Sequence, residues 1–392
     1  RASGGTMENV VVSVNVLDAD GLIACVELFE PDQEAEALTC FERLTAGAAP
    51  RPAVRRPVRS NAASRTFVAL EAAFARRDLT AVDALLGDPL ETIEHPTGTT
   101  YGREGQLESS RWMMRLPDLV FRAEPLATLG ESLCLGRRFV AASGNTAGSR
   151  FEVGAYEIES LVVHVVDATG RLTSAEVFAP DRLGPAIARL HARYAESLPP
   201  GPERTRAEGI ARNYEFWNGM PDPEGFRSVL APAFECVDHR SLGTWAVVGA
   251  DEWIRHWRAQ AELAEGFRRR DDDLLAFTPA VHVLRQTFVG TSRASDGPFE
   301  NVVLAVCVFD ADGRNVRAES YEPGQEALAL ARFDELVAGE HPAPPSRRRV
   351  RANAATPSLA RFQSALAARD RDALGDVFAE SLQFVHHPTG AT

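Results

Sequence analysis

The chain has 392 residues and a formal net charge of −13, with 45% apolar and 25% charged residues. This composition is ordinary for a globular protein, and the length predicts two or three domains that each bury a core. The acidic balance argues against nucleic acid as the main partner, because phosphate binding needs a basic surface. All 42 basic residues are Arg, which excludes mechanisms that need a Lys general base or Schiff base.

The cysteines predict neither a disulfide framework nor a zinc site, because they are odd in number, scattered and without Cys-x-x-Cys spacing. We therefore expect a reducing, cytoplasmic location, with no metal and no bound cofactor. No apolar run approaches membrane-spanning length, so we expect no membrane partner. The cysteines are Cys25, Cys40, Cys134, Cys236 and Cys307.

One strand–turn–strand pattern occurs three times, at 16–31, 165–180 and 308–323. Each copy has an Asp-x-x-Gly turn between two strand-like runs and ends in Pro, which predicts a hairpin followed by a helix. His95 and His387 are 292 positions apart (387 − 95), and the sequence corresponds across this spacing without a gap. Half of that spacing, about 146 residues, is the size of a small domain, so we predict an array of two alternating unit types.

The repeat predicts two complete units, at 64–196 and 206–339, flanked by two partial ones. Residues 1–45 correspond to the end of the second unit type, and residues 357–392 correspond to the start of the first. We expect these two pieces not to complete one another, because both lack counterparts of the third helix and the middle strands.

Pro-rich segments at 50–59, 197–203 and 342–351 separate the units and are predicted to be extended spacers. The first and the third also carry runs of Arg. Such a run could form a patch for an anionic ligand or for nucleic acid. The alternative that we favour is that it lies across acidic surfaces of the neighbouring domains in this acidic chain.

Within a unit, helical periodicity comes first and strand patterns come last, which predicts an α+β fold. In the first complete unit we expect a helix from Ser64 to Arg77 and a short second helix with Thr80 as its N-cap. The remaining expected elements are a strand at 88–95, a helix at 104–114, strands at 119–128, 131–142, 150–166 and 171–178, and a closing helix at 182–196.

Three short motifs carry a family resemblance, together with the Asp-x-x-Gly hairpin and the Glu-x-[Phe/Tyr]-x-Pro exit of the last strand. They are Glu94-His-Pro-Thr-Gly98, Val237-Asp-His-Arg-Ser-Leu-Gly243 and His387-Pro-Thr-Gly390. With the order of elements, these motifs resemble the SnoaL-like domains of the nuclear-transport-factor-2-like superfamily, over nearly all residues outside the linkers. The resemblance implies repeated conical barrels, in which three N-terminal helices lie on a curved antiparallel sheet that encloses a pocket. It also implies a larger bacterial regulator of the adenylate-cyclase-, ATPase- or tetratricopeptide-linked type.

One histidine recurs at the end of the first strand of each unit. It could act as a general acid or base and line the pocket. The alternative that we favour is structural, in which the imidazole ties the strand to the following turn by hydrogen bonds. The histidines are His95, His239 and His387, preceded by Glu94, Asp238 and His386.

A glutamate recurs in the last strand of each unit and shares a strand face with an aromatic residue two positions later. If that face is the cone interior, the carboxylate is a catalytic candidate with a raised pKa. If it is the outer face, the pair serves sheet packing or a dimer interface. The pairs are Glu27 with Phe29, Glu176 with Phe178, and Glu319 with Tyr321.

The resemblance leads one to look for an Asp–Arg–Asp set or an Asp/His pair on the central strands. The corresponding stretches, 151–159 and 299–307, share no recurring acidic set, which argues against two enzymes of one kind. Our first hypothesis is a non-catalytic intracellular array that senses a small hydrophobic ligand or serves assembly. The alternative is a cofactor-independent isomerase, cyclase or hydrolase of a small hydrophobic substrate, with His95 or His239 as base. An open cavity would favour the enzyme, and a cone filled by Phe, Trp and Leu would favour assembly.

Adjacent units are also expected to pair within the chain. Domains of this superfamily generally pair through their sheets, and here neighbouring units differ whereas units two apart match. We therefore expect 64–196 and 206–339 to pack sheet to sheet as a pseudo-dimer with an apolar centre.

Overall fold

The structure is a computed structural model in which the chain forms two compact units. One comprises Ala53–Pro342, and the other is formed by Arg1–Pro52 together with Ala343–Thr392. Each unit is described by itself. The structure describes residues 12–17, 23–30, 32–33, 36–37, 39–40, 55–143, 155–218, 225–241, 243, 245–338 and 378–386.

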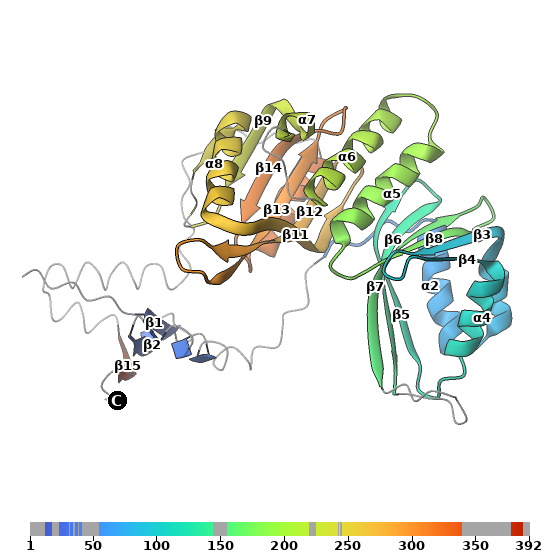
Figure 1. Cartoon of the computed structure of the whole chain (residues 1–392), viewed down its shortest axis with the longest axis horizontal. Coiled ribbons are helices and arrows are strands. Elements are labelled where there is room, and N and C mark those ends of the chain that lie inside the picture. The colour runs from blue at the N-terminus through green and yellow to red at the C-terminus, as the bar shows by residue number, and fades with distance from the viewer. Residues whose placement is uncertain are drawn as a thin grey trace, which may run out of the picture. The chain divides into compact units, whose positions relative to one another are not determined.

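The larger unit contains two repeats, each built from a six-stranded sheet and helices (Figure 1). In the first repeat the sheet order is β4-β3-β8-β7-β6-β5, and only the β3–β8 pair is parallel. Its elements are α2 (Ala62–Ala75), α3 (Leu79–Leu85), β3 (Leu86–Glu94), β4 (Thr99–Gly102), α4 (Arg103–Met113), β5 (Val120–Leu129), β6 (Leu133–Ala142), β7 (Tyr156–Val166), β8 (Leu172–Phe178) and α5 (Leu183–Ser197).

The second repeat has the same plan, with sheet order β10-β9-β14-β13-β12-β11 and one parallel pair, β9–β14. Its elements are α6 (Pro202–Asn218), α7 (Phe226–Val229), β9 (Leu230–Asp238), β10 (Val247–Gly249), α8 (Ala250–Leu263), β11 (Ala264–Phe277), β12 (Val281–Ser292), β13 (Pro298–Phe309), β14 (Asn315–Tyr321) and α9 (Glu326–Val337). The predicted α+β class, with helices first and a mostly antiparallel sheet last, is confirmed. The sheets are not closed into barrels.

Local chemistry explains several element boundaries. Asn61 caps α2, because its side chain accepts a hydrogen bond from the Ser64 amide and the Ser64 hydroxyl accepts one from the Asn61 amide. The N-cap of α3 is Asp78 and not Thr80 as expected, since the Asp78 carboxylate accepts from the Ala81 amide. The short strand β4 was also not predicted from the sequence.

The Asp-x-x-Gly hairpin is held by its own aspartate. In the first repeat one carboxylate oxygen of Asp167 accepts hydrogen bonds from the backbone amides of Thr169 and Arg171. Gly170 then adopts a positive φ of 81°, a conformation that glycine reaches without steric cost. Gly313 has a φ of 73° in the second repeat, so the recurring motif encodes one turn geometry.

Each sheet is covered on both faces by helices of its own repeat. On β7, Val162 packs in the cluster that includes residues of α2, whereas the alternating Leu161 and Val163 pack in the cluster that includes α5. In the second repeat, Leu304 and Val306 pack in the same way in a cluster with α9. The first helices therefore cover the inner face, and the closing helix covers the outer face.

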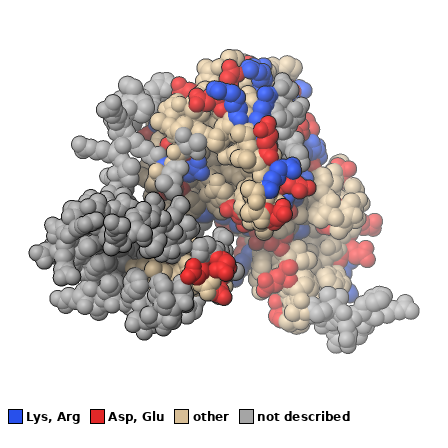
Figure 2. All heavy atoms as spheres, turned by 60° about the vertical axis from the view of Figure 1, so that its left-hand side comes forward, with Lys and Arg blue, Asp and Glu red and all other residues tan. Residues whose placement is uncertain are grey.

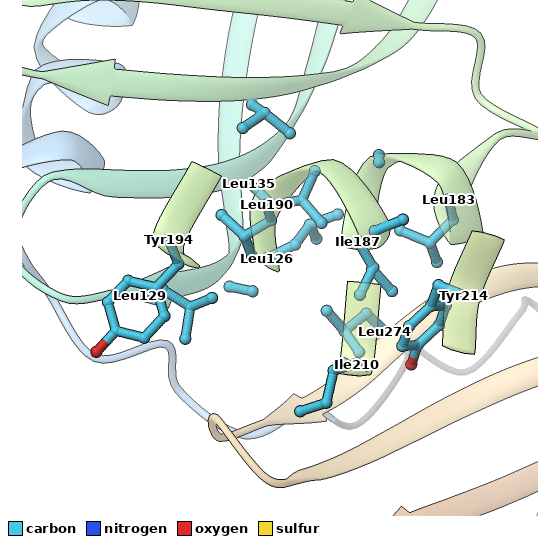
Figure 3. Close-up of a cluster of buried hydrophobic side chains, with 14 of the residues drawn as sticks. Leu126, Leu129, Leu135, Leu183, Ile187, Leu190, Tyr194, Ile210, Tyr214 and Leu274 are labelled. Carbon is cyan, nitrogen blue, oxygen red and sulfur yellow. The ribbon is translucent and has the colours of Figure 1, made fainter. Parts of the chain in front are cut away.

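The closing helix α5 lies between the two repeats, beside α6 (Figure 1). Figure 3 shows α5 side chains between strand residues of the first repeat and residues of the second. The buried cluster contains Leu135 and Leu161 of the first sheet, Leu190 of α5, and Ile210 and Phe309 of the second repeat. The two repeats therefore share one continuous apolar core.

This arrangement corrects the expected sheet-to-sheet packing. The outer face of the first sheet is covered by α5, and that of the second sheet by α9, so the two sheets do not meet back to back. Direct contact between the sheets involves the edge strands β5 and β11. The reason is that α5 buries nine of its 15 residues, which form a face wide enough to contact its own sheet and the next repeat together.

The Arg-rich linker lies across acidic groups of both repeats, as we predicted. Arg55 forms ion pairs with Glu124 of β5 and Asp273 of β11. Arg56 pairs with Asp334 of α9, and its amide donates to the Leu275 carbonyl at 2.8 Å. The equivalent segment at 342–351 lies outside the described residues.

Gly209 of α6 lies directly against the β13–β14 hairpin. A Cβ atom there would lie 1.8 Å from the carbonyl oxygen of Asp312. Ala is favoured over Gly inside a helix by about 1 kcal/mol, so propensity alone would make Gly209→Ala stabilising. We expect instead a loss of about 1–3 kcal/mol in the free energy of unfolding, because hairpin backbone must move. Urea unfolding checks this, and a gain in stability would contradict it.

In the smaller unit, β1 (Val12–Leu17), β2 (Ile23–Phe29) and β15 (Phe378–His386) form a sheet in the order β1-β2-β15. The parallel β2–β15 pair has the register of the first and last strands in the complete repeats, so our expectation that the terminal pieces would not complete one another is wrong for this pairing. The equivalent partners are Val385 with Glu27, Ile93 with Glu176, and Val237 with Glu319.

Candidate functional site

The first repeat has a buried carboxylate, Glu176, at the outer face of its sheet. Its Oε1 accepts hydrogen bonds from Arg189 Nε at 2.7 Å and Arg193 Nε at 2.9 Å, both from α5. Its Oε2 lies 3.2 Å from His95 Nε2. The carboxylate therefore joins the end of β3, the last strand and the closing helix.

The second repeat builds the same cluster around Glu319, which is 1% exposed. Arg332 of α9 donates from Nε at 2.9 Å, and Arg317 also donates to the same oxygen. The other oxygen lies 2.8 Å from His239 Nε2 and accepts from the Tyr321 hydroxyl at 3.0 Å. We name these two groups of side chains the carboxylate clusters.

The electrostatics of the carboxylate clusters do not suit a general acid. Burial by itself would raise the pKa of Glu176, but hydrogen bonds from Arg189 and Arg193 and their charges outweigh it and hold the pKa below its ordinary value. Burial likewise opposes ionisation of Glu319, and hydrogen bonds from His239 and Arg317 more than offset it. Both groups stay ionised near neutral pH and act as fixed anchors for cations.

The two histidines cover the clusters from outside. The ring of His95 stacks on Phe178 with centroids 4.4 Å apart, and its side chain is 44% exposed. The ring of His239 stacks on Tyr321 at 4.5 Å. Six of the ten residues predicted as candidate pocket lining thus come together at the outer sheet face, His95, Glu176 and Phe178 beside α5, and His239, Glu319 and Tyr321 beside α9. Each imidazole therefore lies within hydrogen-bond distance of the glutamate of the last strand, whereas the structural role that we favoured was a bond to the turn after its own strand.

The other predicted residues have separate partners. Glu94 accepts a hydrogen bond from the Tyr101 hydroxyl at 3.0 Å, and burial followed by this carboxylate raises the pKa of Tyr101 to about 12. Asp238 is buried and accepts two hydrogen bonds from Arg240. In the smaller unit, buried Glu27 accepts from the Cys40 thiol at 3.1 Å. His387 lies outside the described residues.

The space between the first sheet and its N-terminal helices, which we call the first cone, holds a cavity of about 30 Å³ that is lined mostly by apolar side chains with four polar ones among them. His164 lines it, fully surrounded by protein, and its Nδ1 has no hydrogen-bond partner among the residues that the structure describes. Burial, and secondarily the charge of Arg138, lowers the pKa of His164 to about 3. Arg138 itself donates from Nε to the Ser160 hydroxyl at 3.0 Å. Thr92 and Gln106 also line the cavity.

Our sequence analysis did not single out these cavity residues. Part of the signal was present, because His164 shares one face of β7 with Val162 and Val166 and so had to lie among apolar residues, but the pattern did not show that this face points inward. Arg138 gave no such signal, since an arginine on a strand is ordinarily solvated.

The interior of the second cone is filled by aromatic side chains. Trp217 and Phe226 meet Trp253 and Trp257 with ring centroids 5.0–5.9 Å apart, and Phe267 packs on Trp257 at 4.8 Å. Edge-to-face contacts of this kind add to the burial free energy of large rings. This interior has the composition expected of a structural core.

A pair of buried histidines lies where the two repeats meet, which we call the junction. His191 of α5 and His282 of β12 are buried with ring centroids 5.4 Å apart. The Tyr214 hydroxyl lies 2.8 Å from His282 Nδ1, whereas neither ring nitrogen of His191 has a partner among the described residues. Over the same described part of the chain, no three His, Cys, Asp or Glu side chains converge as a metal site would require.

No family model matches this sequence, and no curated protein matches it. Among solved structures, the chain is similar to a putative polyketide cyclase from Pseudomonas putida, with 16% identity over 31% of this chain and 92% of that one, at a TM-score of 0.26. It is similar to an epoxide hydrolase-like protein of Mycobacterium tuberculosis, with 21% identity over 30% and 80% of the two chains, at a TM-score of 0.23. A further M. tuberculosis protein, solved with an estradiol hemisuccinate, has 14% identity over 30% and 94%, at 0.26.

Proposed function

We propose that this chain is part of a tandem array of SnoaL-like units that serves as an assembly module in a larger intracellular bacterial regulator. The observation that carries the proposal is the shared core, in which α5 is buried between the sheet of its own repeat and the helices and strands of the next. The cysteines of both units are thiols rather than disulfides in the described structure, which fits a reducing compartment. Among the described residues, no helix is both long and apolar enough to cross a membrane.

The contents of the cones support an assembly role over catalysis. The second cone is filled by Trp and Phe, and the cavity of the first has room for about one or two water molecules. The buried carboxylates are paired with arginines at the outer face, where they hold the closing helix in place. In an array, a closing helix that is fixed to its own sheet and packed against the next repeat sets the orientation of that next repeat.

The test is a bulky side chain introduced on α5 where it contacts the second repeat. A Cβ on Gly184 would lie 2.9 Å from Asp271 and 3.9 Å from Tyr214, both in the second repeat. Gly184→Leu should therefore separate α5 from α6 while α5 keeps its own sheet. In hydrogen exchange of the full chain, we expect faster exchange in α6 and β11 and little change in β7.

The matched control is Gly201→Leu, in the turn between α5 and α6, where a Cβ meets only a backbone oxygen at 4.0 Å. If both variants exchange like the unmodified chain, the repeats do not depend on a common core, and the assembly role loses its support.

Ligand binding in the first cone is a second candidate, favoured by the His164 nitrogen, which lines the cavity with Arg138 and has no partner in the described part of the chain. A buried polar atom without a partner is uncommon and often faces a ligand or an ordered water. The cavity of about 30 Å³ is too small for an organic molecule, so it would have to widen to hold an organic ligand or the substrate of a cyclase, isomerase or hydrolase. A hydrophobic fluorescent probe that binds the unmodified chain but not His164→Phe would establish this role.

A further inference from the structure

A groove of about 450 Å³ lies where the start of α5 meets β11, and four arginines line it. They are Arg182 at the start of α5 and Arg268, Arg269 and Arg270 on β11. Only two carboxylates, Asp181 and Asp271, line the same groove. Acidic and basic side chains are interspersed on the face shown in Figure 2. In this groove, arginines outnumber carboxylates two to one, although the chain as a whole has a net charge of −13.

Two of these guanidinium groups are committed to neighbouring carboxylates. Arg269 pairs with Asp271 at 3.2 Å and lies over the Trp217 ring at 4.3 Å. Arg270 pairs with Asp272 at 2.5 Å. These contacts hold the floor of the groove in a defined geometry.

The other two guanidinium groups have no partner among the described residues. Arg182 and Arg268 are exposed, and neither side chain makes a hydrogen bond or ion pair with any residue that the structure describes. Arg182 also occupies the N-cap of α5, where Ser, Thr, Asp and Asn are favoured and where a cation faces the positive end of the helix dipole. An anion in the groove would satisfy both arginines and remove this local conflict.

We propose that this groove binds a small phosphate-bearing ligand, with Arg182 and Arg268 as its primary contacts. The planar fork of guanidinium matches two oxygens of a phosphate group, which favours phosphate among the anions. The volume lies within the range of about 300–1,000 Å³ of small-molecule sites. Because α5 belongs to the first repeat and β11 to the second, a bound ligand would also strengthen the junction.

The test is titration calorimetry of the full chain with inorganic pyrophosphate. We expect binding that weakens steeply as salt rises from 50 to 200 mM, by analogy with other phosphate contacts. Arg182→Gln and Arg268→Gln should each weaken it by about tenfold or more. Both side chains are exposed and have no partner among the described residues, so the thermal midpoint without ligand should not fall, and Arg182→Gln should raise it slightly because it removes a cation from the N-cap of α5. Arg122→Gln, an exposed arginine of β5 away from the groove, is the matched control.

A second titration uses citrate, which carries a similar negative charge on carboxylates and therefore separates phosphate recognition from general attraction of anions. The proposal is overturned if millimolar pyrophosphate does not bind, if Arg122→Gln weakens binding as much as the groove variants, or if citrate binds as tightly as pyrophosphate. Tighter binding of a nucleoside diphosphate than of pyrophosphate would support the proposal and extend the ligand to a nucleotide. The result does not depend on the assembly role, since the Gly184→Leu test uses no ligand.

Discussion

Replacing Glu319 with Gln should lower the free energy of unfolding of the second repeat by about 2–4 kcal/mol. Removing one partner of a buried ion pair typically costs about 3–5 kcal/mol, because the other charge is left buried without compensation. Here Arg332 keeps Glu335 and Arg317 keeps Glu235 as weaker, more exposed partners, which places the expected cost toward the lower end. Urea unfolding followed by tryptophan fluorescence measures it, since four of the five tryptophans lie in this repeat. They are Trp217, Trp245, Trp253 and Trp257.

The equivalent change in the first repeat should cost less. Arg189 and Arg193 are 31% and 23% exposed, compared with 9% for Arg332, so water compensates them better when Glu176→Gln removes their partner. His239→Ala should cost about 1 kcal/mol, the value of one hydrogen bond, because the ring is 36% exposed. Glu265→Gln, an exposed carboxylate of β11, is the control and should change stability by less than about 0.5 kcal/mol.

This ranking distinguishes an anchoring role from an incidental one. If Glu319→Gln unfolds at the same urea concentration as Glu265→Gln, the carboxylate clusters do not hold the closing helix. If His239→Ala costs as much as Glu319→Gln, the histidine and not the two arginines is the main partner of the carboxylate.

Acidification from pH 7 to pH 5 should destabilise the larger unit by about 2 kcal/mol for each fully buried histidine. Burial lowers the pKa of His191 to about 3, and burial followed by the neighbouring His191 lowers the pKa of His282 well below its ordinary value. Both are therefore neutral in the folded chain, whereas the unfolded chain takes up a proton near pH 6.5. The unfolded state binds more protons, so stability falls as the pH drops from about 6.5 toward about 3, at up to about 1.4 kcal/mol per pH unit and histidine.

The junction should respond first, because His191 of α5 and His282 of β12 are buried beside one another there, and the Tyr214 hydroxyl faces His282. His191→Leu removes one titrating group, so the loss between pH 7 and pH 5 should shrink by about 2 kcal/mol. His95→Asn, at a half-exposed position on the outer face, is the control and should keep the full loss. Urea unfolding of the unmodified chain and of both variants at pH 7 and pH 5 measures these losses. Equal losses of stability in all three proteins would contradict a role for the junction histidines.

The order of elements, the repeat and the turn chemistry followed from the sequence alone. Asp167 and Gly170 specify a hairpin because the carboxylate accepts from local amides and glycine tolerates a positive φ. These are local interactions, so their pattern is complete within a few residues. The same holds for the Arg-rich linker, where the charges of Arg55 and Arg56 in an acidic chain were enough to predict acidic partners.

The sequence alone also paired Glu176 with Phe178 and Glu319 with Tyr321, since alternate strand residues share a face. It could not say which face points into the cone, because both faces of the second half of β7 are largely apolar and buried, and both faces of β8 mix apolar with polar residues. Only the tertiary structure decided that these carboxylates face the closing helix, that His164 and not His95 faces the cavity, and that α5 lies between the two sheets. The physical reason is that burial from two sides leaves the same apolar pattern whichever neighbour covers it, so the choice is made by contacts between residues far apart in the chain.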